Sequence, residues 1–439
     1  MELKKYKKKR ITPQGWKEVT LADAFNTSSG ATPLSTEASY YENGTIPWIN
    51  SGELASPYIY GTTNFISQAG FENSSTEIYP IDTVLVAMYG ATAGKASLLK
   101  MEACTNQAIC AILPNKDYSS TFLKYSIDTL YDHLVGLSSG SARDNLSQAE
   151  LKKLKLIMPP TKDEQNKLVS ILALIDRKIE LNRAINQNLE AMAKQLYDYW
   201  FMQFDFPNEE GKPYKSSGGE MVWNEKLKRE IPKEWEVLNL GQITTSYQQG
   251  LIRSNNQLSD SSEFGYLKMG DLDGKGQYSL QKLARTNATS EEVFLFSLHK
   301  GDFLINVRNS KEIVGKTCLI DYVEENTLFN HMLVRMSFDK VTSFYMNLLF
   351  NTDFMYRAMD GLKQGTTTVI ALYQEDLYRL PIVVPTKNVM DTFSIIEKSI
   401  LNQKELLTNE IISLIKQRDE LLPLLMNGQV SVNSDLSDD

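Results

Sequence analysis

The stretch WKEVTL at residues 16–21 returns as WEVLNL at residues 235–240, 219 positions later in the chain. Four more matches follow in the same order: GEL at 52–54 with GDL at 270–272, DTVLV at 82–86 with DFLIN at 302–306, GKASLL at 94–99 with GKTCLI at 315–320, and the leucine pair 151/154 with 377/380. Their offsets stay between 218 and 226 residues. Collinear matches at a nearly fixed spacing indicate that the chain is an internal duplication.

Each copy divides into two parts of different character. The first part, residues 15–160 and 233–385, mixes short β-rich runs with Gly, Asn, Ser and Thr, which predicts an α+β domain. The second part, residues 161–205 and 386–428, has few Gly or Pro and an apolar period near 3.5, which predicts a long helix. A basic N-terminal arm (1–14), a linker (206–232) and an acidic tail (429–439) complete the chain.

The two long helices have the heptad spacing that is typical of a coiled coil. The predicted seam consists of Leu168, Leu172, Ile175, Ile179, Asn182, Leu189 and Leu196 in the first helix, and of Phe393, Ile396, Ile400, Leu407, Leu414 and Leu421 in the second. We expect the two seams to pair with each other; the alternative is two amphipathic helices that each lie on their own domain. Asn182 would help to fix the register, and Thr161 with Glu164 predicts the cap of the first helix.

The composition excludes several classes of protein. Of the 439 residues, 42% are hydrophobic and 23% are charged, which are ordinary values for a globular chain. No apolar run approaches the ~18 residues of a membrane helix, and the basic N-terminus is not followed by the apolar stretch of a secretory signal. We therefore expect a cytoplasmic protein without a membrane partner. Because Cys104, Cys110 and Cys318 form no paired motif and the histidines are scattered, neither a disulfide nor a metal site is expected.

The motifs of catalysis are incomplete in this sequence. The stretch GATAGKA at residues 90–96 resembles a phosphate-binding loop, but three residues separate its glycines where four are needed, and Ala96 replaces Ser or Thr. The stretch MPPT at residues 158–161 lacks the Asn or Asp that amino-methyltransferases place before paired prolines. No histidine lies in a protease or nucleophile-elbow context. We therefore expect no catalysis by this chain and no cofactor bound to it.

Polar loops with isolated basic residues remain as candidate binding elements, although such loops can also be merely solvated. The net charge is −8, with 9 basic and 14 acidic residues in the first domain and 15 and 18 in the second, so any nucleic acid would have to be contacted locally. Residues 140–147 correspond to residues 365–372, where the loop diverges although its surroundings agree. Two related domains suit a ligand of repeated geometry, such as duplex DNA. The candidate DNA-contacting residues are Tyr89, Thr92, Lys95, Ser141, Arg143 and Asn145 in the first copy, and Arg308, Asn309, Lys311, Lys316, Gln364, Thr366 and Thr367 in the second.

Several phrases resemble those of the specificity (S) subunit of type I restriction-modification systems. They are VLVAMYGATAGK at 84–95, NLSQ at 145–148, EQ at 164–165, DRKIELN at 176–182, LEAM at 189–192, WF at 200–201 and LLPLLMNG at 421–428. The resemblance covers nearly the whole chain. It implies an α+β fold with two duplicated target recognition domains, joined by a long antiparallel two-helix coiled coil with pseudo-twofold symmetry. Each domain would read one half of a split DNA site, and the coiled coil would set the gap.

The resemblance also implies partners. An S subunit recruits two modification subunits, which bind S-adenosylmethionine and methylate adenine, and two motor/nuclease subunits, which use ATP and Mg²⁺. This chain would then be the non-catalytic DNA-recognition subunit of a defence system against foreign DNA, and DNA-mimicking inhibitor proteins are a further class of partner. In copy two, Arg308–Lys311 stands where copy one has Tyr89 and Gly90, which suits contact with guanine or phosphate.

Two other functions remain open on the sequence. A two-domain scaffold, whose coiled coil binds proteins and whose domains bind no DNA, fits the negative charge. A stand-alone methyltransferase or nuclease would need cofactor motifs that the chain lacks. Electrophoretic mobility shifts with and without the modification subunit would separate the first of these functions from DNA recognition.

Overall fold

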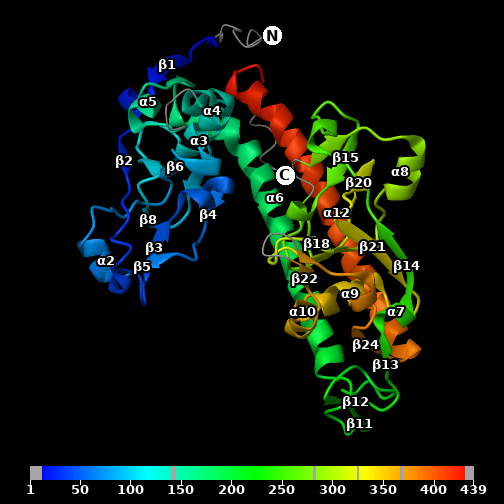
Figure 1. The fold of residues 1–439 in the computed structure, drawn as a ribbon. Helices are drawn as coiled ribbons and strands as arrows, with labels where there is room; N and C mark the ends of the chain where they lie inside the picture. The colour runs from blue at the N-terminus through cyan, green and yellow to red at the C-terminus, as the bar shows by residue number, and fades with distance from the viewer. Residues whose placement is uncertain (1–11, 140–144, 280–282, 324–325, 366–369, 431–439) are drawn as a thin grey trace. The chain divides into compact units, whose positions relative to one another are not determined.

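The computed structural model describes residues 12–139, 145–279, 283–323, 326–365 and 370–430. The chain forms two compact units, residues 1–181 with 411–439, and residues 182–410. Each unit holds one copy of the α+β framework together with part of both long helices (Figure 1).

The first unit is built on a five-stranded sheet in the order β2-β9-β6-β7-β4. These strands are β2 (Thr27–Ser29), β9 (Ile109–Ile112), β6 (Val84–Ala87), β7 (Ala96–Leu99) and β4 (Tyr58–Ile59). A smaller sheet contains β5 (Phe65–Ile66), β3 (Ile46–Ile49) and β8 (Cys104–Thr105), and β1 (Lys17–Thr20) pairs with β10 (Lys155–Met158). The helices are α1 (Leu21–Ala24), α2 (Gln68–Glu72), α3 (Ser120–Asp128), α4 (Tyr131–Ser139) and α5 (Gln148–Lys152). The central strands are apolar throughout because both faces of the sheet are buried: Val84 and Val86 pack with α3, and Leu85 packs in a second cluster.

The second unit repeats this topology. Its main sheet has the order β14-β21-β17-β19, formed by β14 (Thr244–Gln249), β21 (Leu333–Phe338), β17 (Phe303–Asn306) and β19 (Thr317–Leu319). The smaller sheet contains β16 (Ala284–Thr286), β15 (Phe264–Leu267) and β20 (Thr327–Phe329), and β13 (Glu236–Asn239) pairs with β24 (Pro381–Val384). Strand β15 is antiparallel to β16 and parallel to β20, just as β3 is antiparallel to β5 and parallel to β8. The helices are α7 (Leu240–Ile243), α8 (Ser290–Phe296), α9 (Ser343–Phe350), α10 (Asp353–Asp360) and α11 (Gln374–Leu377). The duplication predicted from the sequence is therefore confirmed: four strands of the main sheet, the smaller sheet and the β1–β10 pair each have a counterpart, whereas β4 has none among the strands of the second main sheet.

Equivalent hydrogen bonds give the residue-level correspondence. The amide of Leu21 donates to the carbonyl of Leu154 at 2.9 Å, and Leu240 donates to Leu380 at 2.8 Å. The amide of Leu146 donates to Met88, and that of Leu372 donates to Val307. Leu372 thus corresponds to Leu146, whereas the sequence comparison had placed it opposite Ser147. That comparison was wrong by one residue because the loops before these leucines share almost no side chains.

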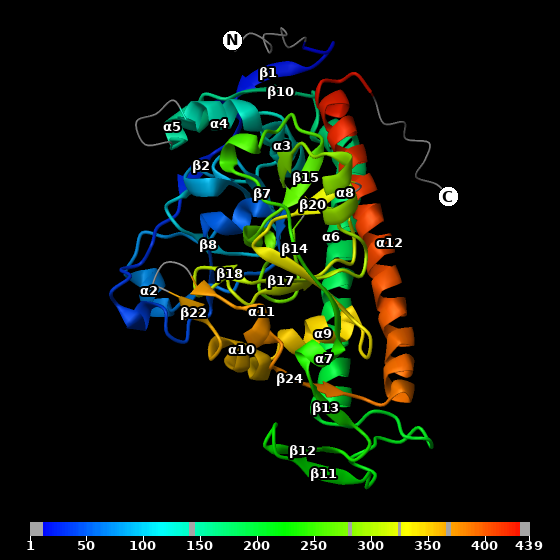
Figure 2. The same ribbon diagram turned by 45° about the vertical axis from the view of Figure 1, so that its right-hand side comes forward.

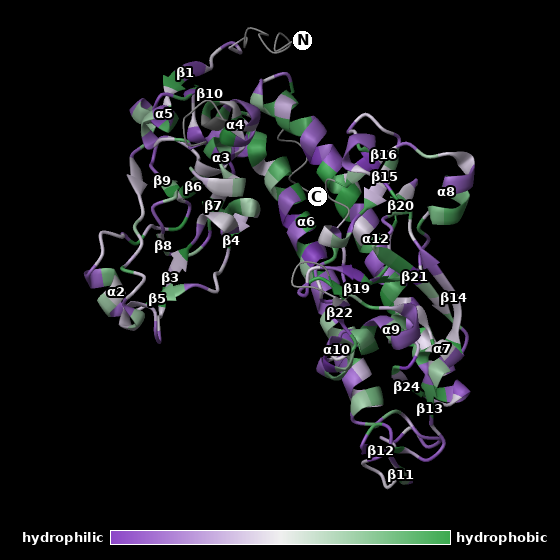
Figure 3. Ribbon diagram, viewed as in Figure 1, coloured by the Kyte–Doolittle hydropathy of each residue, from purple (hydrophilic) through white to green (hydrophobic). Residues whose placement is uncertain are grey.

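The long helices are α6 (Lys162–Tyr197), which continues as one π-helical segment (Asp198–Met202), and α12 (Lys387–Met426). The predicted N-cap of α6 is confirmed: Glu164 N donates to Thr161 Oγ1, and Thr161 N donates to the Glu164 carboxylate, both at 3.2 Å. The hydropathy of α6 alternates along its length, with apolar and polar residues interleaved (Figure 3).

Within each unit the two helices pair in antiparallel fashion (Figure 1 and Figure 2). In the first unit Leu168 and Leu172 share a core with Leu421 and Leu425. In the second unit Asn182 donates to Glu410 at 2.8 Å, and the ring of Trp200 lies 5.8 Å from that of Phe393. The seam residues named in the sequence analysis are all buried or half-buried.

The segment expected to be a linker contains a β-hairpin. Strands β11 (Met221–Asn224) and β12 (Arg229–Pro232) pair with each other, and Phe206 and Ile231 enter the core of the second unit. The ring of Phe206 stacks 5.0 Å from that of Trp235, the first residue of the second copy's framework. The Gly, Ser and Pro content of this segment predicts a linker without secondary structure. Its packing against the core of the second unit gives it an ordered hairpin instead.

One buried charged cluster in each unit ties the α+β domain to the helices. In the first unit Asp176 on α6, 1% exposed, accepts from Tyr125 Oη at 2.7 Å and pairs with Lys124 at 3.4 Å and Arg418 at 3.1 Å. In the second unit Lys404 on α12 pairs with Asp321 at 2.6 Å and Glu190 at 2.9 Å. The buried charge thus comes from α6 and is acidic in one unit, and comes from α12 and is basic in the other.

The described residues contain no candidate membrane span, no candidate metal cluster and no disulfide. No helix there is long and apolar enough to cross a membrane. No group of three His, Cys, Asp or Glu side chains in those ranges could hold a metal ion. Cys104, Cys110 and Cys318 are free and buried, and burial raises the pKa of the Cys104 thiol to about 11.

Candidate nucleic-acid interface

In each unit, turns from separate parts of the sequence meet at one end of the main sheet. In the first unit β2 and β6 end where β9 and β7 begin, because Ser29 pairs with Cys110, Ala87 with Ile109 and Val86 with Ala96. The segments 30–32, 88–95 and 106–107 therefore lie at the same sheet end. In the second unit the same registers bring together segments 250–252, 307–316 and 330–331.

A glycine is required at one position of this sheet end in both units. A Cβ atom on Gly30 would lie 2.0 Å from the carbonyl oxygen of Thr105, and one on Gly250 would lie 2.5 Å from that of Phe329. The amide of the following residue forms a hydrogen bond across this close contact. Ala31 N donates to the carbonyl of Thr105 at 3.0 Å, and Leu251 N donates to that of Phe329 at 2.8 Å. Any side chain here would separate the two turns.

An asparagine shapes the neighbouring turn in both units. Asn106 Oδ1 accepts from the amide of Ala108 at 3.1 Å, and Asn330 Oδ1 accepts from the amide of Met332 at 2.8 Å. Such a bond to the backbone two residues ahead fixes the residue between them at the tip of the turn. That residue is Gln107 in the first unit and His331 in the second.

Different side chains stand on these equivalent backbones. In the first unit Thr32 and Gln107 are exposed and hydrogen-bond through their side chains, and Tyr89 is 37% exposed. In the second unit the equivalent positions hold Ile252, His331 and Arg308. The backbone hydrogen bonds beside Tyr89 and Arg308 are also equivalent, since Met88 N donates to the carbonyl of Ala108 and Val307 N donates to that of Met332. The backbone framework is duplicated, and the displayed chemistry is not.

The electrostatics of the second unit's cluster favour a neutral histidine. Burial and the nearby charge of Arg308 lower the pKa of His331 below its ordinary value. Its Nδ1 is buried and has no hydrogen-bond partner among the described residues, and its carbonyl accepts from Gln249 Nε2 at 2.7 Å. At neutral pH the ring is therefore uncharged and lies beside a cation.

The Gly-Lys stretch that resembles a phosphate loop is a turn between antiparallel strands. Gly94 and Gly315 have φ values of +81° and +91°, and their amides donate to the carbonyls of Ala87 and Asn306. A nucleotide-binding loop leads from a strand into a helix, and here the chain returns directly into β7 or β19. The side chains of the two lysines have different neighbours: Lys95 Nζ lies 4.5 Å from the centre of the Tyr131 ring, whereas the aliphatic side chain of Lys316 lies against Gly274.

The remaining predicted contact residues have mixed surroundings. Thr92 Oγ1 donates to the carbonyl of Ser51 at 2.8 Å, and Asn145 is half-buried. Arg308 and Asn309 form β18 (Arg308–Asn309), in a small sheet with β23 (Ile370–Ala371) and β22 (Gln364–Gly365). Gln364 donates to Asp376 at 2.8 Å, and Lys363 Nζ contacts the carbonyl of Lys311. The predicted residues Ser141, Arg143, Thr366 and Thr367 lie outside the described residues.

Four members of the two clusters were not predicted from the sequence: Thr32 and Gln107 in the first unit, and Ile252 and His331 in the second. A signal was available, because Gly30 and Gly250 are 220 residues apart and Asn106 and Asn330 are 224 apart, within the range of the repeat. A single matching residue in each segment is too weak to see without the structure.

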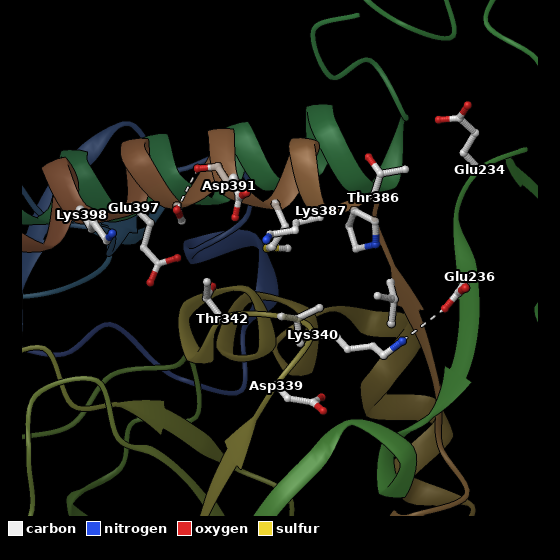
Figure 4. A pocket seen from close by; sticks show the side chains of 15 residues that line it. Glu234, Glu236, Asp339, Lys340, Thr342, Thr386, Lys387, Asp391, Glu397 and Lys398 are labelled. Carbon is white, nitrogen blue, oxygen red and sulfur yellow. Dashed lines mark hydrogen bonds and ion pairs between the residues drawn. The ribbon is translucent and has the colours of Figure 1, made fainter.

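Two larger cavities of the second unit lie away from this sheet end. One, of about 600 Å³, is lined by Asp339, Lys340, Thr342 and the start of α12 (Figure 4). It opens beyond the C-terminal end of β21, at Phe338, whereas the cluster lies before its start at Leu333. The other, of about 560 Å³, surrounds the Lys404 cluster. Neither cavity contains the repeated turns.

Glu397 in the first of these cavities provides a test of the packing there. Burial raises its pKa to about 6, although the hydrogen bond from Thr342 and the charge of Lys398 act to lower it. In the part of the chain that the structure describes, its Oε2 has no hydrogen-bond partner. A raised carboxyl pKa favours the folded state below the unfolded value of about 4.5, and this stabilisation is lost as the pH rises through 6. We expect Glu397→Gln to raise the free energy of unfolding by ~1–2 kcal/mol at pH 7.5.

The same substitution should have no effect below about pH 4.5, where the carboxyl is protonated in both states. Urea denaturation of both proteins across this pH range measures the difference. Glu420→Gln, at an exposed glutamate of the same helix, is the control. Equal stabilisation at every pH would mean that the titration of Glu397 is not the cause.

The family described as type I restriction modification DNA specificity domain matches residues 13–191 and 232–417, once for each copy. The chain is similar to the type I restriction enzyme MjaIX specificity subunit of Methanocaldococcus jannaschii, with 27% identity over 96% of this chain and 94% of that protein. It is 24% identical to the HindI specificity subunit of Haemophilus influenzae, over 69% of this chain and 74% of that one.

A solved structure has a similar fold. The crystal structure of the type I restriction-modification S subunit from M. genitalium matches with a TM-score of 0.54 and 15% identity, over 96% of this chain and 97% of that chain. The fold class expected from the resemblance, with two duplicated α+β domains and long helices, is confirmed. On the match of the family to both copies, the chain belongs to the type I restriction-modification DNA specificity family.

Proposed function

We propose that this chain is the sequence-reading subunit of a type I restriction-modification complex, and that each α+β domain reads one half of a bipartite DNA site. The observation that carries the proposal is the pair of equivalent sheet ends, which share their glycine, asparagine and backbone bonds and differ in exposed side chains. A solely structural role gives no reason for this pattern, because a packing surface would keep its side chains together with its backbone.

Chemistry and cutting belong to partner subunits in this proposal. The modification subunits bind S-adenosylmethionine and methylate adenine, and the motor/nuclease subunits use ATP and Mg²⁺, all in the cytoplasm where the DNA is. The net charge of −8 supports shared binding, because tight contact with phosphates needs cations that this chain does not have in excess. The partner subunits would supply many of those contacts.

Exposed apolar residues on the long helices support the recruitment of protein partners. On α6 in the first unit Leu174 and Leu181 are exposed, and their spacing of seven residues places them on one face. On α12 in the second unit Ile395 and Leu406 are exposed, and a spacing of 11 residues also returns to one face. One such face in each unit suits the binding of two copies of a modification subunit.

The direct test of the function is to map methylated adenines in the DNA of a host that expresses this chain together with its modification subunit. We expect one split motif, with two defined parts separated by unspecified bases. A chain that binds the modification subunit and yields no sequence motif would instead be the scaffold considered above. A single uninterrupted motif would contradict reading by two domains.

The coiled coil is proposed to set the gap between the half-sites. We expect insertion of one heptad after Leu181 in α6 and one after Glu410 in α12, at the boundaries of the two units in the sequence, to lengthen both helices by ~10 Å and preserve the seam. At ~3.4 Å per base pair the mapped spacer should grow by about three base pairs, with both half-sites unchanged.

Insertion into α6 alone is the matched control, because it shifts one seam against the other and should reduce the free energy of unfolding. An active double insert that keeps the original spacer would show that partner subunits set the gap.

A further inference from the structure

We propose that three positions of each domain select the bases: Thr32, Tyr89 and Gln107 in the first domain, and Ile252, Arg308 and His331 in the second. This inference rests on the proposed function and names the side chains that carry it. The six residues form three pairs at equivalent positions of the two frameworks: Thr32 with Ile252, Tyr89 with Arg308, and Gln107 with His331. Arg308 thus adds a cation where the first domain has the phenol of Tyr89.

The Arg308 guanidinium is uncommitted within the described part of the chain. Other arginines of this domain bind its own groups: Arg253 pairs with Glu292 at 2.7 Å, and Arg335 pairs with Asp302 at 3.0 Å. Arg308 is exposed, and among the described residues no carboxylate lies within ion-pairing distance of it. Its backbone is nevertheless fixed, because Arg308 N donates to Asn306 Oδ1 at 3.1 Å and the residue lies in β18. A fixed backbone that carries a guanidinium without an ion-pair partner among the described residues is the arrangement that bidentate recognition of a nucleobase needs.

Ile252, in a segment at the same sheet end as Arg308, adds a second kind of contact. Ile252 is 70% exposed although it directly follows the buried Leu251, so the backbone presents an apolar side chain to solvent. An apolar side chain recognises the methyl group of thymine, and a guanidinium recognises O6 and N7 of guanine. We infer that the half-site of the second domain contains a guanine read by Arg308, next to a base pair whose methyl group contacts Ile252.

The first domain displays different chemistry on the same backbone. Thr32 donates to one lone pair of Gln107 Oε1 and holds that amide in place, which leaves the second lone pair of Oε1 as an acceptor and Nε2 as a donor. A carboxamide reads adenine through N6 and N7. The first half-site is therefore inferred to contain an adenine opposite Gln107, and the two half-sites differ because the two side-chain sets differ.

The test uses the complex of the full chain with its modification subunit and maps methylated adenines for the parent, Arg308→Ala and Arg308→Lys. We expect Arg308→Ala to relax one guanine position of one half-site, with discrimination lower by roughly 5- to 150-fold. Arg308→Lys should relax the same position, because an ammonium group cannot form the bidentate contact. Lys228→Ala, an exposed lysine of the β11–β12 hairpin, removes a charge elsewhere in the same unit and should leave the motif unchanged.

The other possible results contradict either base reading by Arg308 or the proposed function itself. An unchanged motif in Arg308→Ala shows that Arg308 does not read a base. If Arg308→Ala weakens methylation of every sequence equally, and Arg308→Lys restores it, the residue contacts phosphate. If the parent complex yields no split motif, the proposed function itself fails, and the variants do not bear on it.

A reciprocal variant covers the case in which Arg308→Ala does not fold. Thr32→Ile, Tyr89→Arg and Gln107→His together transfer the second cluster onto the first domain. We expect only the half-site of the first domain to change, at the positions that these residues read. A folded triple variant that retains the parent motif overturns the assignment.

Discussion

Asp176→Ala is expected to destabilise the first unit by ~3–5 kcal/mol, because it removes the acidic member of a buried ion pair. The carboxylate is 1% exposed and is shared by Tyr125, Lys124 and Arg418. Lys124, itself only 3% exposed, would keep Asp128 at 2.9 Å as its remaining partner. Removal of the acid therefore leaves positive charge in a site from which water is excluded.

Hydrogen exchange measures this effect for each unit separately, which is necessary because a chain of two units need not unfold in one step. We expect the amides of α3 and of the last turns of α12 to lose protection, and those of β17 and β21 to keep it. Asp419→Ala, which removes the exposed partner of Arg418, is the control and should change little. Equal loss in both units would show that Asp176 does not act locally.

Lys404→Met is expected to destabilise the second unit by ~2–4 kcal/mol. Desolvation lowers the pKa of Lys404, but Asp321 and Glu190 more than offset it, so that the pKa is raised and the amine is charged. Methionine leaves those two carboxylates without their cation. The measurement is again hydrogen exchange, with protection lost in α9 and in the part of α6 that follows Asn182.

Lys398→Met, an exposed lysine on the same helix, is the control and should be nearly neutral. A double variant, Lys404→Met with Asp321→Asn, should recover part of the loss because one of the two uncompensated charges is gone. No recovery would mean that Lys404 stabilises the unit through packing of its aliphatic chain.

The fold was largely predictable because the sequence motifs that indicate it are short and occur in both copies. The tryptophan pair, the Gly-Lys turns and the heptad leucines each occupy a few neighbouring residues, and repetition raises them above chance. The hairpin at residues 221–232 was not predicted, because its order comes from packing of Phe206 and Ile231 against the second unit's core. Lys404 was not singled out either, since only its contact with Asp321, 83 positions earlier, explains a lysine in the interior.

The candidate interface was predictable only in part, for a related reason. Arg308 was identified from its difference from Tyr89 within a recognisable repeat. Gln107 could not be found in this way, because its hydrogen-bond partner Thr32 lies 75 residues away and neither belongs to a conspicuous motif. Side chains that meet across three turns are brought together by sheet register, which the sequence pattern does not specify at single-residue resolution.

The central claim, that the two domains read independently, is tested most directly by exchanging the first domain. Residues 15–160 would be replaced by the equivalent domain of a relative that keeps Lys and Tyr at the positions of Lys124 and Tyr125, so that the contact with Asp176 is retained. Methylated adenines would then be mapped for the complex with the modification subunit. The account predicts a motif in which one half changes and the other half and the spacer persist. A folded, active exchange whose two half-sites change together, or whose motif does not change, would contradict it.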